Sequence, residues 1–211
     1  MLFKIPFATM LEYATRGTND KAQLSKKICG NIKSGNSRVI ERLIQHIIEL
    51  PSEHEISRIF RGGSVLVPVP RSTPILEGTH WPARILAENL VAAGLGEKVK
   101  NLITRVSPVP KSSNYHTAKS RPNCNLHYDS LLCTPSLGFV NKIILVDDVF
   151  TLGRTSCACA RRLKETYPDT DIFVFAAMRT RGFATTLEEI VRPSFNIMIY
   201  NPESDRVRLP D

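Results

Sequence analysis

Short apolar runs alternate with amphipathic stretches along most of the chain. The runs at residues 65–69 and 142–146 are apolar and rich in β-branched side chains, which is typical of strands buried on both faces of a parallel sheet. Together with weaker signals, they predict strands at residues 65–69, 99–103, 142–146, 171–178 and 195–200. Helices are predicted at residues 81–93, 155–167 and 185–191. Strands that alternate with helices indicate an α/β fold with a doubly wound, mainly parallel sheet.

The N-terminal part of the chain is predicted to be helical. Helices are expected at residues 22–32 and 38–50, with Ser37 as the N-cap of the second. The apolar residues of the second helix fall on one face, so we expect it to pack against the main domain or a partner subunit. A glycine pair at residues 62–63 then interrupts the pattern. We therefore predict a helical N-terminal extension at residues 1–60, followed by one main domain at residues 61–211.

The charge balance favours an anionic partner. The 211 residues include 28 Lys and Arg against 20 Asp and Glu, a formal net charge of +8. Residues 98–128 contain no acidic residue, and their basic residues are Lys98, Lys100, Arg105, Lys111, Lys119 and Arg121. Taken alone, this stretch fits an anion clamp and a solvated basic loop equally well. Prolines interrupt residues 105–139, which indicates a long insertion of the kind that often forms a lid or binding loop.

Two features bear on the cellular compartment. The five cysteines are an odd number and lack paired Cys-x-x-Cys spacing, which argues against a disulfide framework and against a zinc ribbon. No apolar run is long enough to span a bilayer, and the first residues lack the features of a secretory signal. We expect a cytoplasmic protein that does not enter a membrane.

The strongest chemical signal follows the predicted strand at residues 142–146, where Asp147 and Asp148 are adjacent. Ligands of open parallel sheets bind at the carboxyl ends of the strands. Neighbouring side chains of a strand face opposite ways, so we expect the following turn to re-aim the two carboxylates. Like charges side by side need a cation or several hydroxyl donors to compensate them, and a ribose diol supplies such donors.

The next residues lead into the predicted helix: Thr151, Leu152, Gly153, Arg154 and Thr155. Free backbone N–H groups, two hydroxyls and the positive end of the helix dipole converge here, which predicts a phosphate site. Gly153 permits positive φ or close backbone approach, and Arg154 can add direct charge. A diol site and a phosphate site a few residues apart have the dimensions of a ribose 5-phosphate.

The apolar run, two acids and Thr/Gly-rich turn resemble the signature with which type I phosphoribosyltransferases bind 5-phosphoribosyl-1-pyrophosphate (PRPP). The resemblance extends over about residues 64–179 to the ComF-like branch of that family. Residues 67–72 resemble the strand and loop that face pyrophosphate there, and Arg105 is placed like a basic residue of that branch. The ComF-like branch has an Arg, Asn and Phe signature whose spacing matches that of Arg121, Asn123 and Tyr128.

The resemblance implies a role for each group of residues. Catalysis would involve Asp147, Asp148 and Arg105. The 5-phosphate of PRPP would be bound by Thr151, Leu152, Gly153, Arg154 and Thr155. Pyrophosphate would be bound by Pro70, Arg71, Ser72, Lys111, Lys119 and Arg121. Mg²⁺ would be held by Asp147 and Asp148, mostly through the substrate. Residues 105–128 would close over bound PRPP.

The chain also departs from the ComF-like pattern. It lacks the cysteine-rich zinc ribbon, its acceptor-side motif is reduced to residues 77–81, and Arg154 stands where a small residue is typical. The leading hypothesis is an enzyme that transfers the phosphoribosyl group from Mg-PRPP to an unidentified nitrogen acceptor and releases pyrophosphate. The alternative is a non-catalytic PRPP or nucleotide sensor or adaptor that acts through a protein or nucleic-acid partner, which the N-terminal helices would contact. A homodimer is compatible with both.

A third reading is a nucleic-acid-binding module that uses a basic surface on the N-terminal helices. The acidic residues Glu12, Asp20 and Glu41 dilute that surface, so this reading ranks last.

Overall fold

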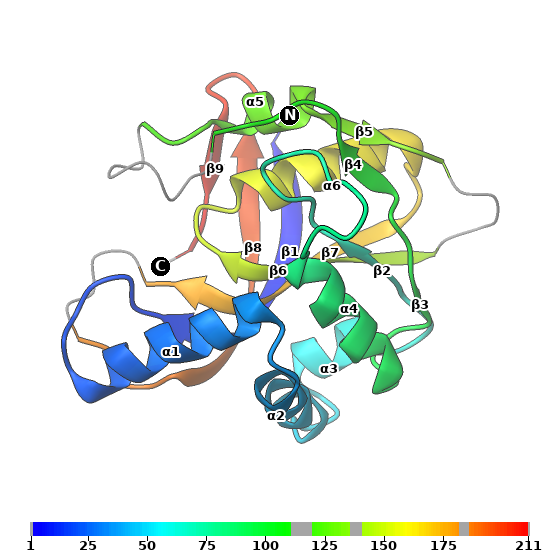
Figure 1. Ribbon diagram of the computed structural model, residues 1–211. Coiled ribbons are helices and arrows are strands. Elements are labelled where there is room, and N and C mark those ends of the chain that lie inside the picture. The colour runs from blue at the N-terminus through cyan, green and yellow to red at the C-terminus, as the bar shows by residue number, and fades with distance from the viewer. Residues whose placement is uncertain (1, 111–119, 136–140, 182–185, 211) are drawn as a thin grey trace.

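The fold is known from a computed structural model, which describes residues 2–110, 120–135, 141–181 and 186–210 (Figure 1). Lys111 and Lys119 lie outside these residues. Within them, seven strands form one sheet. In sheet order they are β3 (Lys98–Val99), β2 (Val65–Pro68), β6 (Lys142–Phe150), β7 (Asp171–Thr180), β1 (Phe3–Tyr13), β8 (Val191–Asn201) and β9 (Arg206–Arg208). Neighbouring strands from β3 to β1 are parallel, whereas β8 and β9 are antiparallel to their neighbours.

Helices cover both faces of this sheet (Figure 1). One face carries α1 (Asp20–Ser34), α2 (Ser37–Ile48), α3 (Glu55–Phe60) and α4 (Pro82–Ala92). The other face carries α5 (Cys124–Asp129) and α6 (Arg154–Thr166). Along β6, Ile143 and Leu145 pack toward α6, while Ile144 and Val146 pack toward the other helices. The prediction of an α/β protein with a mainly parallel sheet is therefore confirmed. No helix in the described ranges is both long and apolar enough to cross a membrane.

The N-terminal segment corrects the prediction of a wholly helical extension. Helices α1 and α2 are confirmed, but residues 3–13 form β1, which lies between β7 and β8 in the sheet. Phe7, Ala8 and Met10 are fully buried, and α1 to α4 share one apolar core with β1 and β6. The segment is thus part of the main core, and the packing shows no division at residue 60. Ser37 is the first helical residue, and Asn36 caps α2 instead.

Two other predicted elements also differ from the structure. Residues 186–190 contain no helix, and the predicted strand at 195–200 begins earlier, at Val191, as the antiparallel strand β8. The predicted strand at 99–103 is divided between β3 and a second sheet of two strands, β4 (Ile103–Arg105) and β5 (Leu131–Cys133). Residues 100–102 belong to neither strand and carry the chain from the main sheet to the second sheet.

The strand order identifies one special position in the sheet. From β2 the chain passes through α4 to β3 on one side, whereas from β6 it passes through α6 to β7 on the other side. The strand order therefore reverses between β2 and β6, which are parallel neighbours. In open α/β sheets, the crevice for ligands lies at the carboxyl ends of the two strands that flank such a reversal.

The central place of β1 gives a stability prediction. Phe7 is fully buried, and its ring stacks on that of Phe150 at a centroid distance of 4.7 Å. Changing Phe7 to Ala should lower the free energy of unfolding by about 3–5 kcal/mol, because it leaves a cavity inside the sheet core. Leu2 is 52% exposed, so Leu2→Ala is the matched control and should change little. Equal denaturation midpoints for the two variants would contradict the position of β1.

Candidate functional site

A pocket of about 190 Å³ lies at the reversal between β2 and β6. Its walls come from the end of β2, the end of β6, the loop that follows β6, the first turn of α6, and the segment before α5. The residues that line it are Val69, Pro70, Arg121, Asp147, Val149, Phe150, Thr151, Leu152, Gly153, Arg154, Thr155 and Ser156. The pocket thus contains all five predicted 5-phosphate residues, one predicted carboxylate and two predicted pyrophosphate residues.

The two carboxylates lie next to each other in the last part of β6. The strand continues beyond them, because β6 pairs with β7 as far as Phe150 and Arg179. Asp147 lines the pocket, and its carboxylate accepts a hydrogen bond from the Ser156 hydroxyl at 3.5 Å. Asp148 does not line the pocket, although its carboxyl group interacts directly with that of Asp147. Burial, followed by the charge of Asp148, raises the pKa of Asp147 well above its usual value.

The loop between β6 and α6 depends on a glycine. Gly153 has φ +67°, and it is the N-cap of α6 without a side-chain capping bond. A Cβ atom at this position would lie 2.7 Å from Cζ of Phe150, so the space admits no side chain. The hydroxyl of Thr151 contacts that of Thr180 at 3.2 Å. Because no side chain caps α6, the N–H groups of its first turn are available to an anion in the pocket.

Arg154 lines the pocket, and one nitrogen of its guanidinium group is bonded to the protein. Its Nη1 donates hydrogen bonds to the backbone carbonyls of Arg121 and Pro122, at 2.8 and 3.1 Å. These bonds hold the segment before α5 against α6. Arg121 lines the pocket, and its buried Nε has no partner among the described residues. Arg121 is therefore the cation best placed to receive an anionic ligand.

Arg105 lies outside the pocket lining. It is only 3% exposed, its Nε donates to the backbone carbonyl of Arg71, and its Nη1 donates to the hydroxyl of Ser130. Arg105 thus anchors the loop at residues 70–72, and of that loop only Pro70 reaches the pocket. Arg71 donates to the backbone carbonyl of His80 and does not line the pocket, and neither does Ser72.

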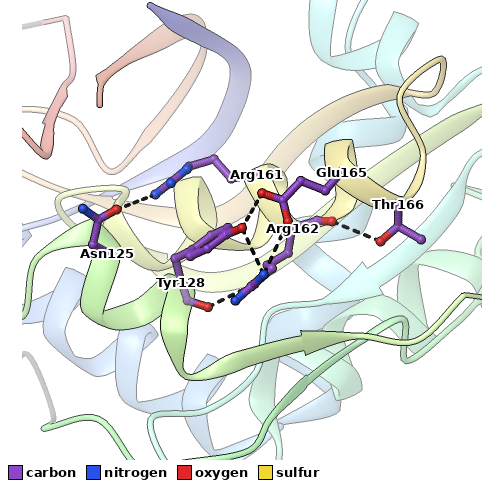
Figure 2. Close-up of polar contacts among 6 residues, drawn as sticks. All are labelled: Asn125, Tyr128, Arg161, Arg162, Glu165 and Thr166. Atoms are coloured by element: carbon purple, nitrogen blue, oxygen red, sulfur yellow. Dashed lines mark hydrogen bonds and ion pairs between the residues drawn. The ribbon is translucent and has the colours of Figure 1, made fainter. Parts of the chain in front are cut away.

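The signature residues around α5 have separate structural roles. The Asn123 side chain caps α5 by accepting from the backbone N–H of Leu126 at 3.0 Å. Figure 2 shows Tyr128 against the outer face of α6, where the guanidinium groups of Arg161 and Arg162 lie 4.2 and 3.6 Å from its ring centroid. The cap begins α5, and the cation–π contacts, together with hydrogen bonds from Arg162 to Tyr128, fix α5 on α6. They thereby fix the segment that carries Arg121.

His127 was missed by the sequence reasoning. It is 3% exposed, and its Nε2 lies 3.5 Å from the hydroxyl of Thr155 in the first turn of α6. Burial, together with the charges of Arg105 and Arg154, lowers the pKa of His127 to about 4. His127 is therefore neutral near pH 7. No local motif marks this residue, since its position depends on how α5 docks onto α6.

The donor set around the pocket fits a metal only through a ligand. Within the described ranges, no group of three or more His, Cys, Asp or Glu residues could hold an ion by itself. A magnesium ion at the two acids Asp147 and Asp148 would need further ligands from a bound molecule and water. No protein-family model matches the chain, and no curated protein is significantly similar to it.

The left-handed conformation of Gly153 can be tested with a matched pair of variants. Gly153→Ala should lower the free energy of unfolding by roughly 2–4 kcal/mol, because strain at positive φ adds to the clash with Phe150. Gly78 has φ +74° but no atom within 4 Å of its Cβ position. Gly78→Ala should therefore show the strain alone, about 1 kcal/mol. Equal losses in the two variants would contradict the close packing at Gly153.

The lowered pKa of His127 predicts a pH effect on stability. The unfolded chain takes up a proton near pH 6.5, whereas the folded chain resists it until about pH 4. The stability is complete above pH 6.5, and it falls as the pH drops toward 4, by roughly 3 kcal/mol for this group. Urea unfolding of the wild type and of His127→Gln between pH 7 and 4 measures this difference. Parallel stability curves would show that His127 is not buried in neutral form.

Proposed function

We propose that the protein binds Mg-PRPP in this pocket and transfers its phosphoribosyl group to a nitrogen acceptor with release of pyrophosphate. The observation that supports this most is the meeting of the Asp147 carboxylate with the uncapped N-terminus of α6 in one pocket. A carboxylate accepts hydrogen bonds from sugar hydroxyls, and a helix N-terminus binds phosphate. The corresponding fold would be that of the type I phosphoribosyltransferases, in a ComF-like form without the zinc ribbon.

The ribose would lie over the end of β6. Its 2- and 3-hydroxyls would donate to Asp147 and Asp148, which relieves the repulsion between the two acids. When pyrophosphate leaves, positive charge develops on the ribose ring, and the same carboxylates would stabilise it. The backbone N–H groups and hydroxyls of residues 151–155 would hold the 5-phosphate. Bound Mg²⁺ would neutralise part of the pyrophosphate charge, with Asp147 and Asp148 as its protein ligands.

One observation favours the alternative, a PRPP or nucleotide sensor or adaptor that binds without turnover. Two of the basic residues proposed to assist PRPP turnover are directed at protein groups: Arg71 bonds to a backbone carbonyl, and Arg105 bonds to a carbonyl and a hydroxyl. In the described part of the chain, this leaves Arg121 as the proposed pyrophosphate cation in the pocket. The protein or nucleic-acid partner of such a sensor would contact the N-terminal helices, where α1 exposes Lys27 and Lys33.

Asp147→Asn tests the ribose site. The raised pKa means that ionised Asp147 is unfavourable in the folded protein near pH 7, so the uncharged variant should melt at the same or a higher temperature. PRPP binding should nevertheless weaken roughly 10- to 100-fold, since a hydrogen bond to a charged acceptor contributes about 1.5–3 kcal/mol. Thermal melts with and without Mg-PRPP measure both effects. Asp171→Asn removes an exposed charge at the start of β7, distant from the site, and is the control.

A destabilised Asp147→Asn protein that keeps its full melting shift with PRPP would contradict the assignment. Turnover is tested separately, by measuring pyrophosphate release from Mg-PRPP with a panel of bases and amines. Release that depends on an acceptor supports the transferase, whereas tight binding without release across the panel supports the sensor.

A further inference from the structure

Thr155 combines two positions that no other described hydroxyl combines. It lines the pocket in the first turn of α6, and its Oγ1 lies 3.5 Å from Nε2 of the buried His127. A hydroxyl has one proton to donate and two lone pairs that accept. The hydrogen bond between Thr155 and His127 therefore decides whether the hydroxyl proton of Thr155 is available to a ligand in the pocket.

The imidazole of His127 has one proton to place between two nitrogens, because the ring is neutral near pH 7. The Nδ1 atom is buried without a partner among the described residues. The Nε2 atom, in contrast, lies 3.5 Å from the hydroxyl of Thr155. With the proton on Nε2, the ring donates to Thr155, and the hydroxyl proton of Thr155 is free to point into the pocket. With the proton on Nδ1, Thr155 must donate to the ring and would present lone pairs to the ligand.

Hydrogen bonds around His127 hold its backbone in place. Ser130 accepts a hydrogen bond from Nη1 of Arg105, and its own hydroxyl donates to the backbone carbonyl of His127 at 2.6 Å. Arg105 is also bonded to the carbonyl of Arg71 in the loop after β2. A continuous set of partly or fully buried polar contacts therefore connects the loop after β2 with the first turn of α6. A buried N–H without a partner is rarer in proteins than a buried lone pair without one, so the unpartnered Nδ1 favours the tautomer that carries its proton on Nε2.

We propose that His127 is a positioning residue that donates from Nε2 to Thr155 and so turns the Thr155 hydroxyl into a hydrogen-bond donor for a phosphate group in the pocket. This inference rests on the proposed function, because it names a donor for the same phosphate site. The specificity of this site for an anion would then depend on His127, which does not line the pocket.

The tautomer can be observed without any ligand. In ¹⁵N NMR spectra of the full chain near pH 7, His127 should show a protonated Nε2 and an unprotonated Nδ1. Protonation at Nδ1 would overturn the inference whatever the protein binds. His127→Leu identifies the His127 signals by their loss.

Affinity for inorganic phosphate and for PRPP gives the second test. His127→Leu should weaken binding about tenfold, the effect of one hydrogen bond to a charged group. His127→Gln carries an amide N–H at the place of Nε2 and should restore affinity to within about twofold of the wild type. A His127→Gln protein that is as weak as His127→Leu would overturn the inference.

A double-mutant cycle separates positioning from a purely structural role. Thr155→Val should weaken phosphate binding by itself, and adding His127→Leu should then cause no further loss, because His127 acts through the missing hydroxyl. Thermal stability should fall further in the double variant, so the two readouts diverge. Independent losses in affinity would overturn the inference alone, whereas a wild type that binds neither phosphate nor PRPP would overturn the proposed function with it.

Discussion

The close packing of Gly153 on Phe150 fixes the geometry on which the pocket depends. The glycine backbone lies where no side chain fits, and the Phe150 ring beneath it stacks on Phe7 in the centre of the sheet. The start of α6 is therefore packed directly on a fully buried part of the core. This attachment places the N–H groups of the first turn of α6 beside Asp147. Asp147 belongs to β6, as Phe150 does, and precedes it by three residues. The phosphate and diol halves of the proposed site thus share one rigid support.

A second constraint is the positive charge collected behind the pocket. Arg105 and Arg154 bond to backbone carbonyls and a hydroxyl, and neither forms an ion pair with a described carboxylate. Their charge is therefore held in place, with the carboxylate of Asp205 offsetting part of it at Arg154, and it acts on the neighbouring pocket through a medium of low polarity. The effect is visible at His127, whose pKa is lowered by burial and by these two arginines. An arrangement of this kind favours the binding of an anion.

The elements that local pattern determines could be predicted from the sequence. The strand before Asp147, the turn at Gly153 and the helix that follows each depend on neighbouring residues, and the structure brings residues 151–155 together with Asp147. Strand β1 could not be predicted in this way, because Pro6 interrupts its apolar pattern and its partners β7 and β8 are distant in sequence. Arg105 was expected near the ligand but contacts Arg71 and Ser130, and His127 was not expected at all. Both positions are set by tertiary packing around α5, which no local motif encodes.

The position of β1 also has a consequence for how the chain is made. Thr9 and Ser194 are hydrogen bonded at 2.8 Å although 185 positions separate them. During synthesis the strand leaves the ribosome early, and both of its neighbours in the sheet emerge much later. Its apolar side chains are without their native cover for most of that time, and closing so long a loop is slow. The proposed pocket is lined by Phe150, whose ring stacks on Phe7, so it is complete only after β1 has joined the sheet.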